Sequence, residues 1–358
     1  MPATRETLRR FAVARSLFGP TSLGRALAAF GFVQADPIRA PARAQDLTLR
    51  HRVQGYRAGD LDRRYRALAV EEDVFINYGF VTEPVRRLMH PRGGSWTRTQ
   101  RALVEALLAF VRERGEVHPR DVDREFAHGR VTNYWGGTSS ATTHLLDLMH
   151  YRGLVRVVRR EAGIRIYAVQ EPLDAAADRA ERARRLDALA DVAIRKYAPL
   201  PEASLAFVLR RLRYAAPQWQ RDITAAIRRA KLRLASARVD GVTWYWPAGE
   251  ALVSSDMEPT VRLLAPFDPI VWDRRRFEML WGWAYRFEAY TPVTKRTRGY
   301  YALPLLWRDH VIGWGNITVV DGALNVDLGY VGRAPRERAF TRALDEDLER
   351  LRSFLGCR

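Results

Sequence analysis

Apolar residues recur at helical spacing in the middle of the chain. They do so over residues 98–114, where the pattern ends at Gly115, a residue typical of helix C-caps. Shorter helices are predicted over 118–126 and 138–153, and the segment 154–169 alternates apolar and basic positions as a β-hairpin does. Three helices followed by a hairpin form a winged helix, which is a helix-turn-helix variant.

The same order of elements is predicted, more loosely, twice more. One copy has helices over 4–18 and 21–30, a third helix after Pro37 and a hairpin near 68–77, and the other has helices over 186–197, 201–213 and 217–232 and a hairpin that turns at Asp240 and Gly241. The third helix of a winged helix can enter a groove of a duplex, so the repetition is typical of DNA-binding architectures.

From about residue 262 the pattern changes to strands. Four strands are predicted as an antiparallel meander, over 286–293, 300–307, 310–320 and 323–331. A last helix would cap the sheet with one apolar stripe made of Phe340, Leu344, Leu348 and Leu351. The tryptophans of this region, Trp272 among them, are expected to pack in the core or between domains.

We therefore predict a mainly α fold with β structure (α+β), in which three tandem winged-helix units precede a C-terminal antiparallel β module capped by a helix. The predicted domains are 1–92, 93–171 and 172–250 for the winged helices and 251–358 for the β module. A length of 358 residues agrees with several packed units, since domains commonly have roughly 100–200 residues.

The chain is strongly basic. Its 59 Lys and Arg residues against 41 Asp and Glu give a formal net charge of +18. Such an excess indicates a polyanionic partner, and nucleic acid is the first candidate. Only three of the basic residues are lysines. GC-rich codon usage would explain that ratio, but it does not explain the net excess of positive charge.

Several kinds of chemistry find no support in the sequence. It has no P-loop, GxGxxG, GxSxG or HExxH motif, its histidines show no metal-ligand spacing, and its one cysteine is Cys357. We expect neither a metal nor a cofactor. Because a run of 18 apolar residues and a signal-peptide core are both missing, we expect a cytoplasmic, nucleoid-associated protein without a membrane partner.

One segment, residues 31–53, combines candidate catalytic and basic side chains. A strand-like Phe32 and Val33 would place Gln34 and Asp36 on the same side, directly before Pro37. On spacing alone, Asp36 and Pro37 are a typical N-cap and first residue of a helix. The basic residues that follow would then form a solvated helix face: Arg39, Arg43, Arg50, His51 and Arg52.

The sequence FVQADPIRAPARAQDLTLRHRV at 32–53 carries a resemblance, together with LLAPFDPIVWDRRRFEMLWGWAYRFEAY at 263–290 and YYALPLLW at 300–307. With these segments the chain closely resembles the winged-helix DNA glycosylases of the AlkZ and YcaQ type, over nearly its whole length. The resemblance implies a bacterial DNA repair enzyme that excises N7-alkylated purines and unhooks interstrand crosslinks. Gln34-Ala35-Asp36 matches the aspartate (QxD) form of the catalytic motif, which favours broad alkylation repair.

The resemblance assigns catalysis to Asp36 and Gln34. A carboxylate near the anomeric carbon stabilises an oxocarbenium-like state and can take a proton from the attacking water. The Gln34 amide both donates and accepts hydrogen bonds, which suits it to orienting that water. An N7-alkylated guanine is already cationic and leaves without a general acid. Nearby arginines are expected to keep Asp36 ionised.

Contacts to double-stranded DNA are expected from two basic segments, and the protein is expected to act as a monomer. The candidate residues are Arg39, Arg43, Arg50, His51 and Arg52 in the first segment, and Lys295, Arg296 and Arg298 at the tip of a hairpin within 291–301. Glycosylases that also cut the strand commonly use an amine as nucleophile. Because no lysine precedes Lys196, we predict a monofunctional enzyme that leaves an abasic site.

Two alternatives have the same charge. A non-catalytic winged-helix DNA-binding protein or transcription regulator would also share the fold, and in the sequence only Gln34 and Asp36 separate it from a glycosylase. A regulator would prefer one operator and ignore lesions, whereas a repair enzyme would bind undamaged DNA with little sequence preference. An RNA-binding accessory factor is a third reading, without a recognisable RNA motif.

Overall fold

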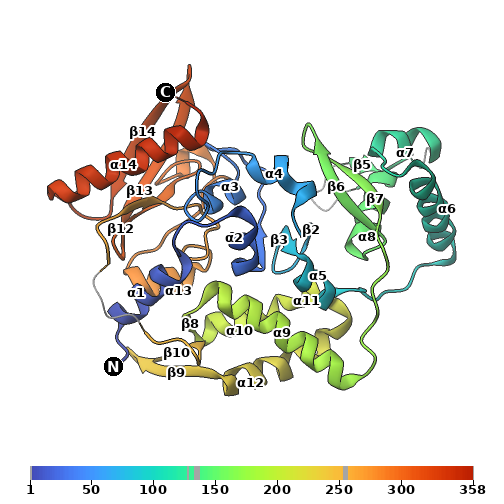
Figure 1. Ribbon diagram of the computed structural model, residues 1–358, viewed down its shortest axis with the longest axis horizontal. Coiled ribbons are helices and arrows are strands. Elements are labelled where there is room, and N and C mark those ends of the chain that lie inside the picture. The colour runs from blue at the N-terminus through green and yellow to red at the C-terminus, as the bar shows by residue number, and fades with distance from the viewer. Residues whose placement is uncertain (1, 127–128, 133–137, 253–256, 358) are drawn as a thin grey trace. The chain divides into compact units, whose positions relative to one another are not determined.

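The computed structural model describes residues 2–126, 129–132, 138–252 and 257–357. The chain divides into two compact units, each assembled from segments that are distant in sequence. Unit 1 consists of Met1–Leu61, Asp191–Leu209 and Ile227–Arg358, and unit 2 consists of Asp62–Ala190 and Arg210–Ala226. The N-terminal segment, blue in Figure 1, therefore belongs to the same unit as the C-terminal segment, which is red.

Unit 1 joins short N-terminal helices to two antiparallel sheets. The N-terminal elements are α1 (Arg5–Ser16), α2 (Leu23–Phe30), β1 (Phe32–Gln34) and α3 (Ala44–Leu49). One sheet has the order β8-β10-β9, with β8 (Leu200–Pro201), β9 (Leu234–Val239) and β10 (Val242–Pro247). The other has the order β11-β12-β13-β14, with β11 (Val261–Leu263), β12 (Leu303–Trp307), β13 (His310–Val320) and β14 (Ala323–Tyr330). The remaining helices are α13 (Arg274–Trp281), η3 (Val293–Lys295) and α14 (Arg338–Leu355).

Local sequence explains where these elements begin and turn. Thr4 and Thr7 form a capping box at the start of α1. The tight turns between β9 and β10 and between β13 and β14 use Asp-Gly pairs, in which Asp240 and Asp321 both have positive φ. Along α14, Phe340, Leu351 and other apolar residues face inward, and the helix packs against β11.

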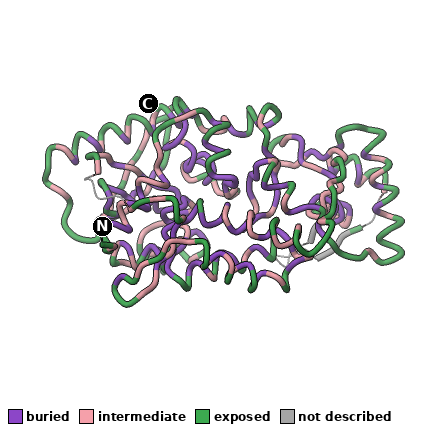
Figure 2. The backbone as a smooth tube through the Cα atoms, turned by 60° about the horizontal axis from the view of Figure 1, so that its bottom comes forward, coloured by how far each residue is buried: buried purple, intermediate pink, exposed green. Residues whose placement is uncertain are grey.

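Unit 2 contains hairpins and the helices that precede them. Its elements are η1 (Tyr65–Ala67), β2 (Val70–Val74), β3 (Tyr78–Thr82), α5 (Glu83–Met89), α6 (Arg98–Arg114), α7 (Pro119–Phe126), β4 (Arg130–Thr132), β5 (Thr138–Ser140), α8 (Ala141–Tyr151), β6 (Val155–Glu161), β7 (Ile164–Val169), α11 (Leu212–Ala215) and η2 (Pro217–Asp222). Four helices contain the positions where the chain passes between units: α4 (Asp60–Arg64), α9 (Arg179–Tyr197), α10 (Glu202–Arg210) and α12 (Ile223–Arg233). Along the helices, buried and exposed residues alternate, as purple and green do in Figure 2.

The predicted α+β class is confirmed. The middle copy has the expected order, because α6, α7 and α8 are followed by the hairpin β6–β7, and its core is shared by all five elements. A bridge between Val117 and Tyr167 adds a further strand position to that hairpin. The first hairpin is longer than predicted, since β3 continues to Thr82. The boundaries of the four predicted domains remain a prediction, alongside the division into two units.

Two predicted elements are wrong. No helix opens at Asp36 and Pro37, because the next helix, α3, begins only at Ala44. Residues 286–293 do not form a strand; the fourth strand of the sheet is β11, at 261–263. The segment from Glu288 to Gly299 is an irregular loop containing η3, not a hairpin, because the Glu288 carboxylate binds three of its backbone N–H groups.

The interior of unit 1 contains two ion pairs that join its N-terminal and C-terminal segments. Arg52 and Asp268 form two parallel hydrogen bonds, Nη1 to Oδ2 at 2.6 Å and Nη2 to Oδ1 at 3.0 Å, and both side chains are fully buried. Arg52 also donates to the carbonyls of Ser16 and Thr48. Arg50 pairs with Asp347 of α14 at 3.1 Å. These two arginines therefore link α3 and the residues after it to Asp268 and Asp347 in the C-terminal part of the chain.

We expect Arg52→Met to lower the free energy of unfolding by about 3–5 kcal/mol, because Asp268 would be left as a buried charge without its partner. Equilibrium unfolding in urea measures this change. The matched control is Arg39→Met, whose side chain is exposed and whose loss should change stability by less than about 0.5 kcal/mol. Equal effects of the two substitutions would contradict a structural role for the Arg52 pair.

Candidate active site

Gln34 ends β1, and its amide is held by a tryptophan from a distant segment. Nε1 of Trp272 donates to Oε1 of Gln34 at 2.9 Å. Because an indole N–H only donates, this bond fixes the amide oxygen on the Trp272 side. The Trp272 ring lies 4.8 Å from the ring of Tyr197 and 5.9 Å from that of Phe207. An aromatic stack thus sets the orientation of the Gln34 amide.

Asp36 follows β1 in a local turn of its own. Its Oδ1 accepts a hydrogen bond from the backbone N–H of Ile38 at 2.9 Å, and its own N–H donates to Oε1 of Gln45 at 3.2 Å. This i to i+2 bond is an Asx turn. Since no helix starts here, interpreting Asp36 as an N-cap is wrong. The carboxylate stays half-exposed, two residues beyond Gln34.

The environment of Asp36 favours a carboxylate that can accept a proton. Partial burial raises the pKa of Asp36 above the usual 3.8, and the Ile38 N–H bond only partly opposes this. Arginines were expected to hold this carboxylate ionised, but within the described residues no arginine forms an ion pair with it. A higher pKa makes Asp36 a stronger base than an ordinary aspartate.

The structure also brings a lysine to the strand that carries Gln34. Nζ of Lys196 donates to the carbonyl oxygen of Phe32 at 2.5 Å and lies 4.2 Å from the centre of the Phe30 ring. Burial, with a smaller contribution from the charge of Arg52, lowers the pKa of Lys196 to about 7. The sequence analysis did not place Lys196 beside this strand, because the two are 164 residues apart.

Three predicted DNA contacts lie in the interior instead. Arg50 and Arg52 are buried in their pairs with carboxylates, and His51 is also buried. Nε2 of His51 lies 2.9 Å from the carbonyl oxygen of Leu263, and burial followed by the charge of Arg50 holds the pKa of His51 well below 6.5. The expected solvated basic face is therefore not formed by these three residues, because their side chains are paired or uncharged inside the fold. Their contact with DNA stays a prediction.

The other basic candidates remain at the surface. Arg39 and Lys295 are exposed, and Arg43 is half-buried at the start of α3. Arg296 is also half-buried and donates to the carbonyl of Thr291 at 2.8 Å. The guanidinium of Arg298 lies 5.2 Å and 5.5 Å from the ring centres of Trp283 and Trp314, so it anchors the loop as well as carrying charge.

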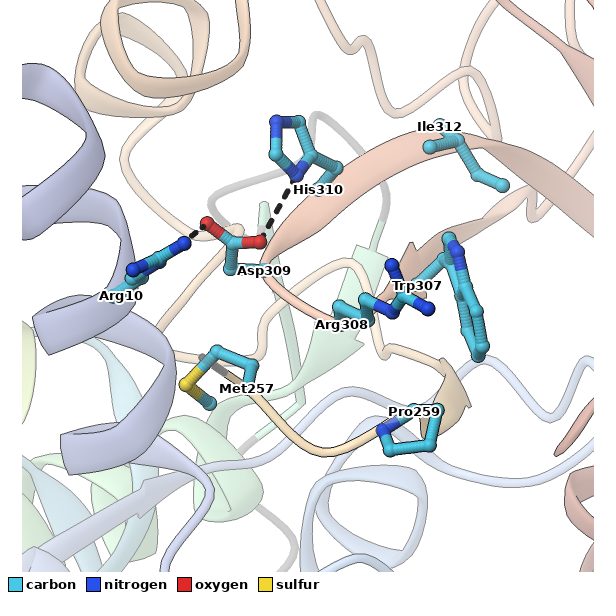
Figure 3. A pocket seen from close by; sticks show the side chains of 8 residues that line it. All are labelled: Arg10, Met257, Pro259, Trp307, Arg308, Asp309, His310 and Ile312. Atoms are coloured by element: carbon cyan, nitrogen blue, oxygen red, sulfur yellow. Dashed lines mark hydrogen bonds and ion pairs between the residues drawn. The ribbon is translucent and has the colours of Figure 1, made fainter. Parts of the chain in front are cut away.

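A separate hollow of about 500 Å³ lies elsewhere in unit 1. Figure 3 shows Arg10 and His310 turned toward Asp309 at its wall. Burial would raise the pKa of Asp309, but hydrogen bonds from His310 and Arg9 outweigh it and lower this pKa to about 2. The Asp309 carboxylate is therefore held ionised by His310 and Arg9 and is unsuited to proton transfer. Across the described residues, no cluster of His, Cys, Asp and Glu has the makings of a metal site.

Comparison with known proteins identifies a family of similar sequence and a solved structure of similar fold. The family model "DNA glycosylase AlkZ-like" matches residues 27–354, which include Gln34, Asp36 and Trp272. Among solved structures, the chain is similar to the DNA glycosylase AlkZ of Streptomyces sahachiroi, with a TM-score of 0.63 and 12% identity. The match covers 100% of this chain and 98% of that one. No helix in the described ranges has both the length and the apolar character needed to cross a membrane.

Replacing Asp36 by Asn should stabilise the protein at neutral pH. A carboxylic acid whose pKa is raised by folding contributes stability below its unfolded pKa and loses it as the pH rises through the folded pKa. The wild type should therefore lose stability relative to Asp36→Asn as the pH rises from about 4. Asn can still accept the Ile38 N–H bond. Thermal unfolding of both proteins across this range checks the sign, and a wild type that gains relative stability would contradict it.

Proposed function

Because the chain belongs to the AlkZ-like DNA glycosylase family, whose substrate is DNA, we propose that it excises N7-alkylated purines and unhooks DNA interstrand crosslinks. The observation that carries this proposal is the pair of Asp36 and Gln34, a carboxylate of raised pKa two residues beyond an amide oriented by Trp272. A reaction through a cationic sugar needs such an anion and such a polar neighbour.

Asp36 supplies the charge and the base. As the bond from C1′ to the purine nitrogen lengthens, positive charge develops on the sugar, and the carboxylate stabilises it. Water then adds to C1′ and gives up a proton, which Asp36 accepts. The leaving purine takes the bonding electrons, and its positive charge from N7 alkylation is thereby neutralised. No protein acid is needed for this step, which restricts the reaction to bases that are already cationic.

Gln34 orients the water and does not activate it. Its amide neither gains nor loses a proton at neutral pH, but it offers hydrogen bonds in a direction set by Trp272. The QxD form of the motif supports a broad range of alkylated purines. The alternative function, a transcription regulator, gives no reason for an aspartate isolated from cations beside an oriented amide.

Exposed basic groups supply the DNA-binding surface in this proposal. Arg39 lies three residues beyond Asp36 and is exposed, and Lys295 is exposed at the tip of the 288–299 loop. Arg43 and Arg296 are half-exposed and add to the same two segments. Charged groups of this kind bind phosphates and make affinity fall with salt, without reading sequence.

We expect Asp36→Asn to reduce excision of N7-methylguanine from a duplex by about 10²–10⁴-fold, because both the base and the stabilising charge are lost. Gln34→Ala should cost about tenfold, as for one neutral hydrogen bond. Single-turnover incubation, alkaline cleavage and a gel measure both. DNA affinity should stay within about twofold. Full activity of Asp36→Asn would refute the assignment, and a larger loss for Gln34→Ala would reverse the two roles.

The acid limb of the pH profile gives an independent check of Asp36. Asp36 must be ionised to act, so excision should fall as the pH is lowered through its pKa. Because burial raises that pKa, the midpoint should lie above 3.8. Rates of the wild type are measured with and without enzyme at each pH to subtract spontaneous depurination. A midpoint at or below 3.8 would show that the group being titrated is not the half-buried Asp36.

We expect no covalent adduct when the reaction is treated with borohydride, since the enzyme is proposed to be monofunctional. Lys196 is buried against the Phe32 carbonyl, and Lys231 forms an ion pair with Glu202, so neither is placed to attack a sugar. Lys295 is the exposed lysine and serves as the control. Trapping that disappears in Lys295→Arg would overturn monofunctional action and name the nucleophile.

A further inference from the structure

Large apolar side chains are exposed together on one loop of unit 1. Tyr290, Val293 and Tyr300 lie within eleven residues, and Tyr290 and Val293 are 79% and 74% exposed. Single exposed apolar residues are normal on a protein surface, whereas several gathered on one segment mark a place of contact. The loop also carries the exposed Lys295, so the contact surface combines apolar and positive groups.

The base of this loop is held rigidly from within. The Glu288 carboxylate accepts hydrogen bonds from the backbone N–H groups of Thr297, Arg298 and Gly299 at 2.9, 2.8 and 3.3 Å. Gly299 has a φ of +121°, and an added Cβ would come within 2.1 Å of Oδ1 of Asn316. The exposed side chains are therefore presented by a loop whose ends are already ordered, which reduces the entropy lost on binding.

Tyr290 belongs to an aromatic cluster of unit 1. Its ring packs edge-on against Phe287 at 6.0 Å, and Phe287 packs against Phe267 and Tyr301 at 5.2 Å each. The charge of Asp36 acts on both tyrosines: after burial, it is the next cause that raises the pKa of Tyr290 and of Tyr301. The exposed ring is thus backed by packed aromatics. Phe267 of this cluster directly precedes Asp268, whose carbonyl accepts the Trp272 N–H, and Trp272 donates to Gln34, so contacts connect the cluster to the candidate catalytic pair.

We propose that Tyr290 is the stacking platform for the damaged base, and that it recognises the purine by its positive charge. This inference rests on the proposed function, because it assumes that Asp36 acts on the sugar of a cationic purine. A base joined to that sugar lies within a few ångströms of Asp36, where the exposed Tyr290 ring can cover its face. Aromatic faces attract cations through their quadrupole, and bases of every kind stack on them.

The direction of charge movement predicts which kinetic constant depends on Tyr290. The purine is cationic before the reaction, whereas in the transition state the positive charge passes to the sugar. A ring that stacks on the base therefore stabilises the bound substrate at least as well as the transition state. Loss of the ring should weaken binding of damaged DNA and leave the maximal rate nearly unchanged. Loss of the Asp36 carboxylate should instead lower the maximal rate and leave DNA binding nearly unchanged.

The test measures binding to duplexes with and without one N7-methylguanine whose sugar carries a 2′-fluorine, which makes the glycosidic bond resist cleavage. We expect Tyr290→Leu to raise the Kd for the lesion duplex about tenfold and to change that for the undamaged duplex less than twofold. Tyr290→Trp should bind the lesion as well as or better than the wild type. Tyr214→Leu, at a partly exposed tyrosine of unit 2, is the matched control.

Two results would overturn the inference. Unchanged lesion affinity in Tyr290→Leu would remove the stacking role, and an equal loss on both duplexes would make Tyr290 a general DNA contact instead. Circular dichroism of each variant confirms that it is folded. Excision of an unfluorinated duplex by the wild type is measured in parallel. Failure of that reaction would count against the proposed function, whereas the binding series alone decides the role of Tyr290.

Discussion

The buried ion pair between Arg52 and Asp268 is the interaction on which the site depends. It joins residues 216 positions apart. The backbone carbonyl of Asp268 also accepts a hydrogen bond from the backbone N–H of Trp272 at 2.8 Å. Trp272 in turn binds Gln34. The orientation of the Gln34 amide is therefore fixed through a series of contacts that begins at a salt bridge. Breaking a buried pair of this kind is costly because a lone charge remains, so the fold holds the geometry strongly.

Cations in the interior of unit 1 are bonded to carbonyl oxygens as well as to carboxylates. Lys196 donates to the carbonyl of Phe32, and the buried Arg276 donates to the carbonyls of Pro269 and Ile270, two consecutive residues of the turn that leads to Trp272. Basic residues thus organise the backbone around the site while Asp36 itself is left without an ion pair in the described structure. That separation explains how a strongly basic protein can keep one aspartate with a raised pKa.

Local sequence patterns predicted much of the fold, but they did not predict the features that depend on contacts between residues distant in sequence. The hairpins at 155–169 and 234–247 and the helix at 98–114 follow from periodicity and from glycine at turns and caps, which are properties of neighbouring residues. The basic run Arg50-His51-Arg52 was misinterpreted because its carboxylate partners lie more than 200 residues away. Trp272 was expected only to pack, because the residues around a tryptophan that binds Gln34 look the same in the sequence as those around a tryptophan in a core. A strand was predicted over 286–293 and a hairpin tip within 291–301, but the backbone of the 288–299 loop binds the Glu288 carboxylate instead of a neighbouring strand.

The hydrogen bonds between the Glu288 carboxylate and the loop backbone have an evolutionary consequence. Because backbone N–H groups bound to the Glu288 carboxylate close the loop at its base, the exposed side chains of Val293 and Lys295 are not needed to close it. Substitutions there would alter what the loop touches without unfolding what supports it, as happens in the variable loops of binding proteins built on rigid scaffolds. Related sequences can therefore vary at these positions and change what the loop binds, while Gln34, Asp36 and the buried residues that support them stay constant.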